Sequence, residues 1–208
     1  MERFIITIGR QFGSGGREIG QKLAKRFSVE YFDKELLQLA AEQSGWSKEC
    51  FEKADEKSPG SLMHALAVGL SMTGTAFQYG GGFTDENIFK FQSDTIQKLA
   101  SDRSCIIVGR CADYILRNHP NCFNIFIHAP LNKRIPRVAQ QEHLSERAAM
   151  ELIKKTDKSR ANYYNYYSGK VWGDSASYHL SIDASLAGVD RTVDFIESFV
   201  LTNLDIKK

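Results

Sequence analysis

The sequence has little of several features that mark particular classes of protein. Its 208 residues include only four cysteines, none with CxxC spacing, so neither a structural zinc site nor a disulfide framework is expected. Lysine plus arginine number 27 and aspartate plus glutamate 25, and the net charge of +2 gives no reason to expect nucleic acid or a membrane surface as a partner. We expect reduced, mostly buried thiols in a cytoplasmic protein, and the sequence gives no sign of its oligomeric state.

Long hydrophobic runs are also absent. Residues 1–8 lack the basic and apolar regions of a signal peptide. The least polar long stretch, residues 62–77, is interrupted by histidine, glycine, serine and threonine and is too polar to span a membrane. With 42% hydrophobic and 25% charged residues, the chain has ordinary globular composition. It is long enough to bury a core as one domain with room for an insertion.

Short apolar runs alternate with helical patterns along the chain. Apolar runs that stop at glycine or a polar residue indicate buried strands over residues 4–8, 29–32, 105–108 and 123–127, and alternation predicts a last strand over 178–183. Apolar residues at helical spacing predict helices over 19–27, 36–40, 88–99, 112–116, 131–143, 145–167 and 194–200. This alternation predicts an α/β fold with a parallel sheet covered by helices on both faces.

Capping residues and prolines refine these boundaries. Ser145 is placed to cap the helix that follows it. Pro136 either kinks the helix expected over residues 131–143 or marks its true start. Between residues 45 and 83 we expect one short helix over 47–54, another from residue 59 to about 70, and a flexible loop at 80–82.

A glycine-rich segment, Gly9–Glu18, joins the first predicted strand to the first predicted helix. Glycines let backbone N–H groups turn inward around a phosphate, and a helix N-terminus adds positive potential. The alternative is a tight turn that needs positive φ at one or two glycines. The segment is not a strict Walker A motif: with Gly15 as its last glycine, Arg10 stands at the first glycine and Gly16 at the lysine. A dinucleotide-binding G-x-G-x-x-G pattern also fails, at Glu18.

Five segments together resemble the cytidylate kinase-like family, a branch of the P-loop nucleoside monophosphate kinases. They are ITIGRQFGSGGREIG at residues 6–20, YFDKELL at 31–37, IIVGRCADYIL at 106–116, IFIHAP at 125–130 and DKSRANYY at 157–164. The resemblance implies a single domain over residues 1–208 with a five-stranded parallel core, an acceptor-binding insertion at about 33–100 and a mobile lid at about 140–170. It also implies transfer of the γ-phosphoryl group of ATP to CMP or dCMP, with Mg²⁺.

The resemblance implies that the glycine loop holds the β-phosphate of ATP, through Gly13, Ser14, Gly15, Gly16 and Arg17. Gly16 stands where family members carry a lysine. Arg17 leaves the helix about 100° further round, and it either reaches a phosphate or points to solvent. Glu18 aligns with a threonine that approaches Mg²⁺. A carboxylate suits that cation, but glutamate is also an ordinary first-turn residue favoured by the helix dipole.

The resemblance places the acceptor nucleotide against Asp33, Arg110 and Asp113. Asp33 either binds the acceptor or caps the next helix. Arg110 matches an arginine that grips the acceptor phosphate, and a guanidinium suits bidentate phosphate contact. Val108 and Cys111 stand where cytidylate kinases have aspartates, so the Walker B carboxylate is missing from its usual place. Asp113 either compensates for the second of these or is simply solvated.

Positive charge is concentrated in residues 131–170, which hold nine lysines and arginines against four acidic residues. This net +5, beside −3 on the rest of the chain, fits a lid that closes over ATP, although such runs also occur on ordinary helix surfaces. Arg134, Arg137 and Arg160 best match the family's lid arginines, and Lys158 is a weaker match. The tyrosines at 163, 164, 166 and 167 either flank a base or, as we expect, pack the end of a long helix. The resemblance places residues 183–185 near the adenine.

Three functions therefore stand open. The first is a nucleoside monophosphate kinase acting on CMP. The changed loop and acceptor segment leave room for a P-loop kinase with another small acceptor. The absent lysine and aspartate leave room for a catalytically impaired nucleotide-binding module. No G-x-S-x-G elbow occurs, and the five histidines are scattered without metal or triad spacing, so hydrolase chemistry is not supported.

Overall fold

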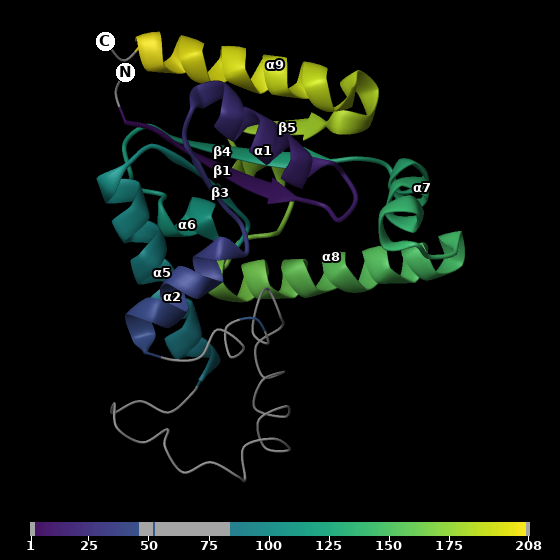
Figure 1. The fold of residues 1–208 in the computed structure, drawn as a ribbon, viewed down its shortest axis with the longest axis horizontal. Coiled ribbons are helices and arrows are strands. Elements are labelled where there is room, and N and C mark those ends of the chain that lie inside the picture. Colours follow the sequence, from purple (N-terminus) through teal and green to yellow (C-terminus); the bar gives the residue numbers. More distant parts are fainter. Residues whose placement is uncertain (1–2, 46–51, 53–83, 207–208) are drawn as a thin grey trace.

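A computed structural model of the chain describes residues 3–45, 52 and 84–206. At its centre lies a five-stranded, wholly parallel sheet in the order β2-β3-β1-β4-β5 (Figure 1). The strands are β1 (Ile5–Arg10), β2 (Glu30–Phe32), β3 (Cys105–Val108), β4 (Cys122–His128) and β5 (Leu180–Asp183). The predicted α/β fold is confirmed. Because β1 is central, the glycine loop that follows it begins between the ends of β3 and β4.

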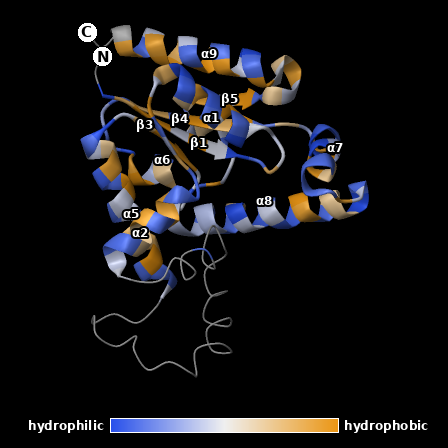
Figure 2. Ribbon diagram, viewed as in Figure 1, coloured by the Kyte–Doolittle hydropathy of each residue, from blue (hydrophilic) through white to orange (hydrophobic). Residues whose placement is uncertain are grey.

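Helices cover both faces of the sheet. One face carries α1 (Gly16–Phe27) and α9 (Ala184–Ile206), and the other carries α2 (Glu35–Ser44), α5 (Asp85–Asp102) and α6 (Ala112–Ile115). Alternate residues of β1 serve the two faces, since Ile6 and Ile8 pack in the first core and Ile5 in the second. Figure 2 shows the apolar strands enclosed between helices whose blue residues face outward.

Two further helices connect β4 to β5. They are α7 (Leu131–Glu142) and α8 (Glu146–Ser168), and a 3₁₀ turn at Ser175–Ser177 follows them. Figure 1 shows α8 running across the molecule from α7 to α2 and α5. The two helices pack through Val138 of α7 and Ile153 of α8. This connection brings α8 beside the glycine loop.

The ends of α8 follow the sequence prediction. The hydroxyl of Ser145 accepts a hydrogen bond from the N–H of Ala148, so the predicted cap is confirmed. Near the other end, Tyr163 and Tyr164 are buried against α5 and α6, whereas 58% of Tyr166 is exposed. Tyr167 is partly buried and stacks on Phe89 of α5, so the predicted packing role holds for every one of these tyrosines except Tyr166.

One alternative and one boundary were wrong. The helix predicted from residue 131 does begin at Leu131, so Pro136 does not start it: the carbonyl of Pro130 already accepts the N–H groups of Lys133 and Arg134. Tyr178 does not belong to the last strand, which begins at Leu180. Its N–H closes the 3₁₀ turn instead, by donating to the carbonyl of Ser175.

Part of the predicted organisation falls outside the described residues. The helices expected at 47–54 and from residue 59, and the loop at 80–82, lie there except for the helical Glu52. The bounds of the insertion and of the lid stay predictions. Within the part of the chain that the structure describes, no helix combines the length and the apolar character needed to cross a membrane.

Candidate active site

The glycine loop between β1 and α1 has the backbone of an anion-binding cradle. Gly13 has a φ of 78° and Gly15 a φ of 89°, both in the left-handed region that favours glycine. Gly15 is the N-cap of α1, and no side chain in the described residues caps this helix. The N–H groups of its first turn are therefore available to an anionic ligand.

Neighbouring elements hold this loop in place. The hydroxyl of Ser14 lies 2.9 and 3.1 Å from two main-chain carbonyls. The N–H of Phe12 donates to the carboxylate of Asp157, on α8, at 2.7 Å. A Cβ atom on Gly13 would lie 2.6 Å from Cγ2 of Val138, on α7. The loop conformation is thus fixed by α7 and α8 as well as by its own glycines.

A cavity of about 580 Å³ opens beside the loop, a size typical of small-molecule sites. Its walls are the loop, the first turn of α1, the start of α2, and parts of α7 and α8. The charged side chains that line it are Arg10, Arg17, Glu18, Asp33, Lys34, Arg137, Glu142 and Arg160. Cationic groups outnumber acidic ones, which suits a ligand with several negative charges.

Asp33 is a buried carboxylate that faces three arginines. Its Oδ2 lies 2.9 Å from Nε of Arg17, and its Oδ1 lies 3.2 Å from Nη1 of Arg110 and 3.8 Å from Nη2 of Arg10. The N-cap of α2 is Lys34 and has no side-chain cap, so the capping alternative for Asp33 was wrong. These four side chains carry a net charge of +2 at the carboxyl edge of the sheet.

Arg110 reaches this carboxylate from a strained turn. Gly109, Arg110 and Cys111 have φ angles of 76°, 55° and 56°, all in the left-handed region. For a non-glycine residue that region costs about 1–2 kcal/mol. The Arg110 side chain is 1% exposed and also donates to the carbonyl of Val108 at 3.0 Å. Backbone strain that the surroundings hold in place is typical of binding and catalytic sites.

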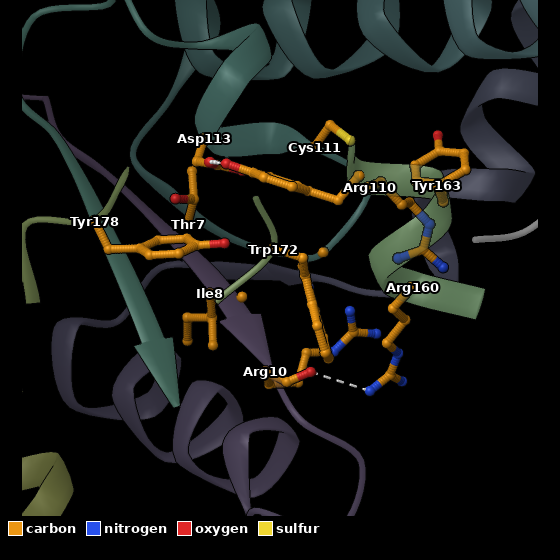
Figure 3. A pocket seen from close by; sticks show the side chains of 13 residues that line it. Thr7, Ile8, Arg10, Arg110, Cys111, Asp113, Arg160, Tyr163, Trp172 and Tyr178 are labelled. Atoms are coloured by element: carbon orange, nitrogen blue, oxygen red, sulfur yellow. Dashed lines mark hydrogen bonds between the residues drawn. The ribbon is translucent and has the colours of Figure 1, made fainter. Parts of the chain in front are cut away.

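A second, much smaller cavity lies between the sheet and α8 (Figure 3). Its volume of about 20 Å³ is room for roughly one water molecule. Arg10, Arg110 and Arg160 meet along it, and Nη1 of Arg160 donates to the carbonyl of Arg10 at 3.2 Å. Trp172 lines the cavity beside these arginines. Helix α8 therefore closes tightly over the end of β1.

Asp113 lies at the far end of this small cavity. Its carboxylate accepts a hydrogen bond from the hydroxyl of Tyr164 at 2.7 Å, and burial raises the pKa of Asp113 above its ordinary value. The side chain is therefore partly buried, hydrogen-bonded to α8 and away from the glycine loop. It lines the same cavity as Arg110 but is engaged with α8.

The three predicted lid arginines have different surroundings. Nη2 of Arg137 lies 2.5 Å from Glu18, and the Arg137 guanidinium lies over Gly15. Arg160 reaches the end of β1, with its guanidinium 5.6 Å from the Phe12 ring centre. Arg137 and Arg160 both line the larger cavity.

Arg134 differs from these two because it is buried in the support of the loop. It donates to the carbonyls of Ala129 and Phe12, at 2.8 and 2.9 Å, and pairs with Asp157 at 2.6 Å. It lines neither cavity. Arg134 therefore positions the loop. Lys158, the weaker match, is exposed and lines neither cavity.

Comparison with known proteins identifies the family. The family model described as the cytidylate kinase-like family matches residues 5–186. The chain belongs to the cytidylate kinase-like family. The cytidylate kinase of Pyrococcus horikoshii is 24% identical over 186 residues, 88% of this chain and 81% of that protein. The cytidylate kinase of Methanopyrus kandleri is 22% identical over 206 residues, 94% and 92% of the two chains.

Solved structures agree on the fold of this cytidylate kinase-like chain. An uncharacterized protein from Eubacterium ventriosum is 30% identical, with a TM-score of 0.71 over 95% of this chain and 98% of its own. A shikimate kinase from Bacteroides thetaiotaomicron is 10% identical with a TM-score of 0.53, over 95% and 98% of the two chains. At that identity the likeness concerns the P-loop kinase fold alone.

Few residues of this family member suit a metal ion. The described part of the chain has no group of three or more histidine, cysteine, aspartate or glutamate side chains that could hold one. Mg²⁺ commonly binds through one or two carboxylates plus substrate phosphates and water. Glu18 is a carboxylate of this kind: its side chain is 45% exposed and lines the larger cavity, and Mg²⁺ would replace the cations Arg137 and Lys22 that pair with it in this structure. Val108 and Cys111 are buried and supply no carboxylate.

The last strand ends in a local hydrogen-bond motif. The carboxylate of Asp183 accepts bonds from the N–H and the hydroxyl of Ser185, at 2.9 and 2.7 Å, and these lower the pKa of Asp183. The motif shapes the turn from β5 into α9. The placement of adenine near residues 183–185 stays a prediction.

Arg10 is the site residue that sequence reasoning did not select. It is 8% exposed, lines both cavities and faces Asp33. Its position at the carboxyl end of the central strand was a signal for it. So was its alignment with the first glycine of the Walker pattern, next to a loop that has lost its lysine.

Proposed function

We propose that the chain is a nucleoside monophosphate kinase that transfers the γ-phosphoryl group of Mg-ATP to CMP or dCMP. One observation carries the proposal: two anion-binding arrangements share one edge of the sheet. The first is the glycine loop at the uncapped start of α1, and the second is the arginine group of Arg17 and Arg110 around Asp33. Phosphoryl transfer needs a donor and an acceptor phosphate held side by side. Family membership supports the choice of CMP or dCMP as acceptor.

In this proposal the loop holds the donor. The backbone of residues 13–17 binds the β-phosphate of ATP, and Arg137 and Arg160 neutralise charge on the transferred group. Glu18 approaches the Mg²⁺ that accompanies ATP. Bound Mg²⁺ neutralises the phosphates and holds them in a reactive orientation. Arg134 does not contact the nucleotide in this proposal. It positions the loop by donating to the carbonyl of Phe12.

The arginine group then receives the acceptor. Asp33 keeps Arg17 and Arg110 in place before a ligand arrives, and a phosphate dianion competes with this single carboxylate for their guanidinium groups. The acceptor phosphate is already an ionised nucleophile, so the reaction requires no general base. Positioning and charge neutralisation supply most of the catalysis. Asp33 and Asp113 contribute to binding of the acceptor nucleotide.

A second candidate is a P-loop kinase with a different small acceptor. The observation that favours it is the apolar character of Val108 and Cys111, each at most 3% exposed where cytidylate kinases have aspartates. The site therefore lacks two carboxylates that cytidylate kinases carry there, the Walker B carboxylate among them. This candidate uses the same donor site and the same Arg110.

The test is formation of ADP from Mg-ATP with CMP, dCMP, UMP and AMP supplied separately. The proposal expects strong stimulation by CMP or dCMP only. Stimulation by none of them, with ATP binding intact, favours another acceptor or a nucleotide-binding module without turnover. A broad panel of other small acceptors then separates those two outcomes.

A further inference from the structure

The loop lacks the Walker lysine for a steric reason. A Cβ atom on Gly16 would lie 2.6 Å from Cβ of Arg10 and 3.2 Å from its Cγ. A separation of 2.6 Å between unbonded carbon atoms is well inside their contact distance of about 3.5–4.0 Å. A lysine at 16 and the present Arg10 side chain therefore exclude each other. The Cβ atom of Arg10 fills the space that the Cβ atom of a lysine at 16 would need.

Arg10 also carries its charge to the appropriate place. Arg10 lines the larger cavity together with Gly13, Gly15 and Gly16, and its Nη2 lies 3.8 Å from Asp33, another residue of that lining. Its backbone is fixed by the pairing of β1 with β4 and by the bond that its carbonyl accepts from Arg160. A cation on the rigid end of the central strand is thus held beside a loop built to accept phosphate.

We propose that Arg10 supplies the phosphate-binding cation that the missing Walker lysine would otherwise provide. This inference rests on the proposed function, because it assigns Arg10 to the ATP of that site. The competing role is that of a counter-ion for Asp33 alone. Arg17 and Arg110 lie closer to that carboxylate, at 2.9 and 3.2 Å against 3.8 Å for Arg10, so a third guanidinium is more than Asp33 needs.

The first experiment measures binding of Mg-ATP, ADP and adenosine by calorimetry, without an acceptor, in the wild type and in Arg10→Met. The variant keeps the apolar stem and removes the charge. We expect the Kd for Mg-ATP to rise roughly 10- to 100-fold, as for one lost charge-assisted hydrogen bond, while adenosine binding changes less than about 2-fold. The matched control is Arg103→Met, which removes an exposed arginine paired with Glu30 at the other end of β2. It should leave both affinities unchanged.

The second experiment exchanges the two positions. Gly16→Lys alone should bind ATP poorly, because the lysine and Arg10 collide. Arg10→Gly alone should bind poorly because no cation remains. The double variant Arg10→Gly/Gly16→Lys removes the collision, since the next neighbour of a Cβ at 16 is Ile127 at 3.4 Å. We expect the double variant to bind Mg-ATP at least 5-fold more tightly than either single variant.

The outcomes separate this inference from the proposed function. Wild-type protein that does not bind ATP overturns both. Wild-type protein that binds ATP, with an unchanged Kd in Arg10→Met, overturns the role of Arg10 alone. An unchanged ATP Kd with a raised acceptor KM also overturns it, because Arg10 would then belong to the acceptor site. If Arg10→Met does not fold, as judged by circular dichroism, the folded double variant decides: ATP affinity supports the inference and its loss overturns it.

Discussion

Single side chains decide the charge balance of this site. Asp33, which follows β2, gathers Arg10 from the end of β1, Arg110 from the turn after β3 and Arg17 from the first turn of α1. The arginines repel one another, and Asp33 offsets part of that repulsion while leaving net positive charge for a ligand. In the proposed reaction an incoming phosphate takes over part of this role from the carboxylate.

The acceptor role of Arg110 makes a direct prediction. Arg110→Ala should cut kcat/KM for the acceptor by about 100-fold or more, as expected when a charged phosphate contact is lost. The measurement is steady-state kinetics with CMP varied at saturating ATP. Arg117→Ala is the matched control, because Arg117 is exposed and donates only to the nearby carbonyl of Tyr114 among the bonds that the structure records for it. Equal kinetics in a folded Arg110→Ala variant would remove this residue from the site.

The partly buried carboxyl group of Asp113 should make the free energy of unfolding depend on pH. Burial raises the pKa of Asp113, so the folded state keeps its proton at a pH where the unfolded chain, with a pKa of about 3.9, has released it. Its ionisation therefore destabilises the fold progressively as pH rises from about 4 through the folded-state pKa. Asp113→Asn keeps an acceptor for Tyr164 and removes the charge.

We expect Asp113→Asn to have nearly the wild-type Tm at pH 4 and a higher Tm at pH 7–8. Thermal denaturation followed by circular dichroism across this range measures the difference. Asp94→Asn, at an exposed position of α5, is the control and should shift Tm little at either pH. A Tm difference that does not change with pH would contradict the buried-charge explanation.

At the scale of the elements, α7 and α8 hold the glycine loop from outside. Asp157 of α8 accepts the N–H of Phe12, Arg134 of α7 donates to its carbonyl, and Val138 of α7 packs against Gly13. The same two helices supply Arg137 and Arg160 to the cavity. Movement of this helix pair would therefore change the loop and the arginines together, as a lid requires.

The close contact of the loop with α7 is testable at Gly13. Gly13→Ala should destabilise the fold by about 3 kcal/mol, since it adds left-handed strain to a 2.6 Å contact with Val138. Gly169→Ala is the matched control: its φ is 67°, but nothing lies within 4 Å of the added atom. That change should cost about 1 kcal/mol.

Denaturant titration of both glycine variants gives the two free energies of unfolding. The double variant Gly13→Ala/Val138→Ala, compared with Val138→Ala alone, separates strain from collision. The cost of Gly13→Ala should fall to about 1 kcal/mol when the valine methyls are gone. An equal cost for Gly13→Ala and Gly169→Ala in the wild-type background would show that α7 does not press on the loop.

Local signals explain why most elements were predictable. Five apolar runs gave five strands in a parallel sheet, and Ser145 gave a helix start, because these depend on neighbours in sequence. Pro136 does not start α7 because the carbonyl of Pro130 already begins that helix. Tyr178 does not start the last strand because it belongs to a turn that packs on β4. The buried position of Arg134 and the collision of Arg10 with Gly16 arise only when segments distant in sequence meet.

At the scale of the whole molecule, the sheet brings distant segments to one edge. The glycine loop, Asp33 and Arg110 follow β1, β2 and β3, and Arg137 of α7 and Arg160 of α8 line the same cavities. Of the nine cationic residues in 131–170, these two reach the larger cavity, beside Arg10, Arg17 and Lys34. The phosphates of a bound donor and a bound acceptor would together neutralise the positive charge at this edge of the sheet.

Direct phosphoryl transfer tests the central claim. The measurement incubates the wild-type chain with Mg²⁺, [γ-³²P]ATP and CMP, and separates the nucleotides by chromatography. Labelled CDP that requires the protein and CMP, and that falls by about 100-fold in Arg110→Ala, is the predicted result. ATP that binds but leaves CMP, dCMP and every other monophosphate unlabelled would contradict it.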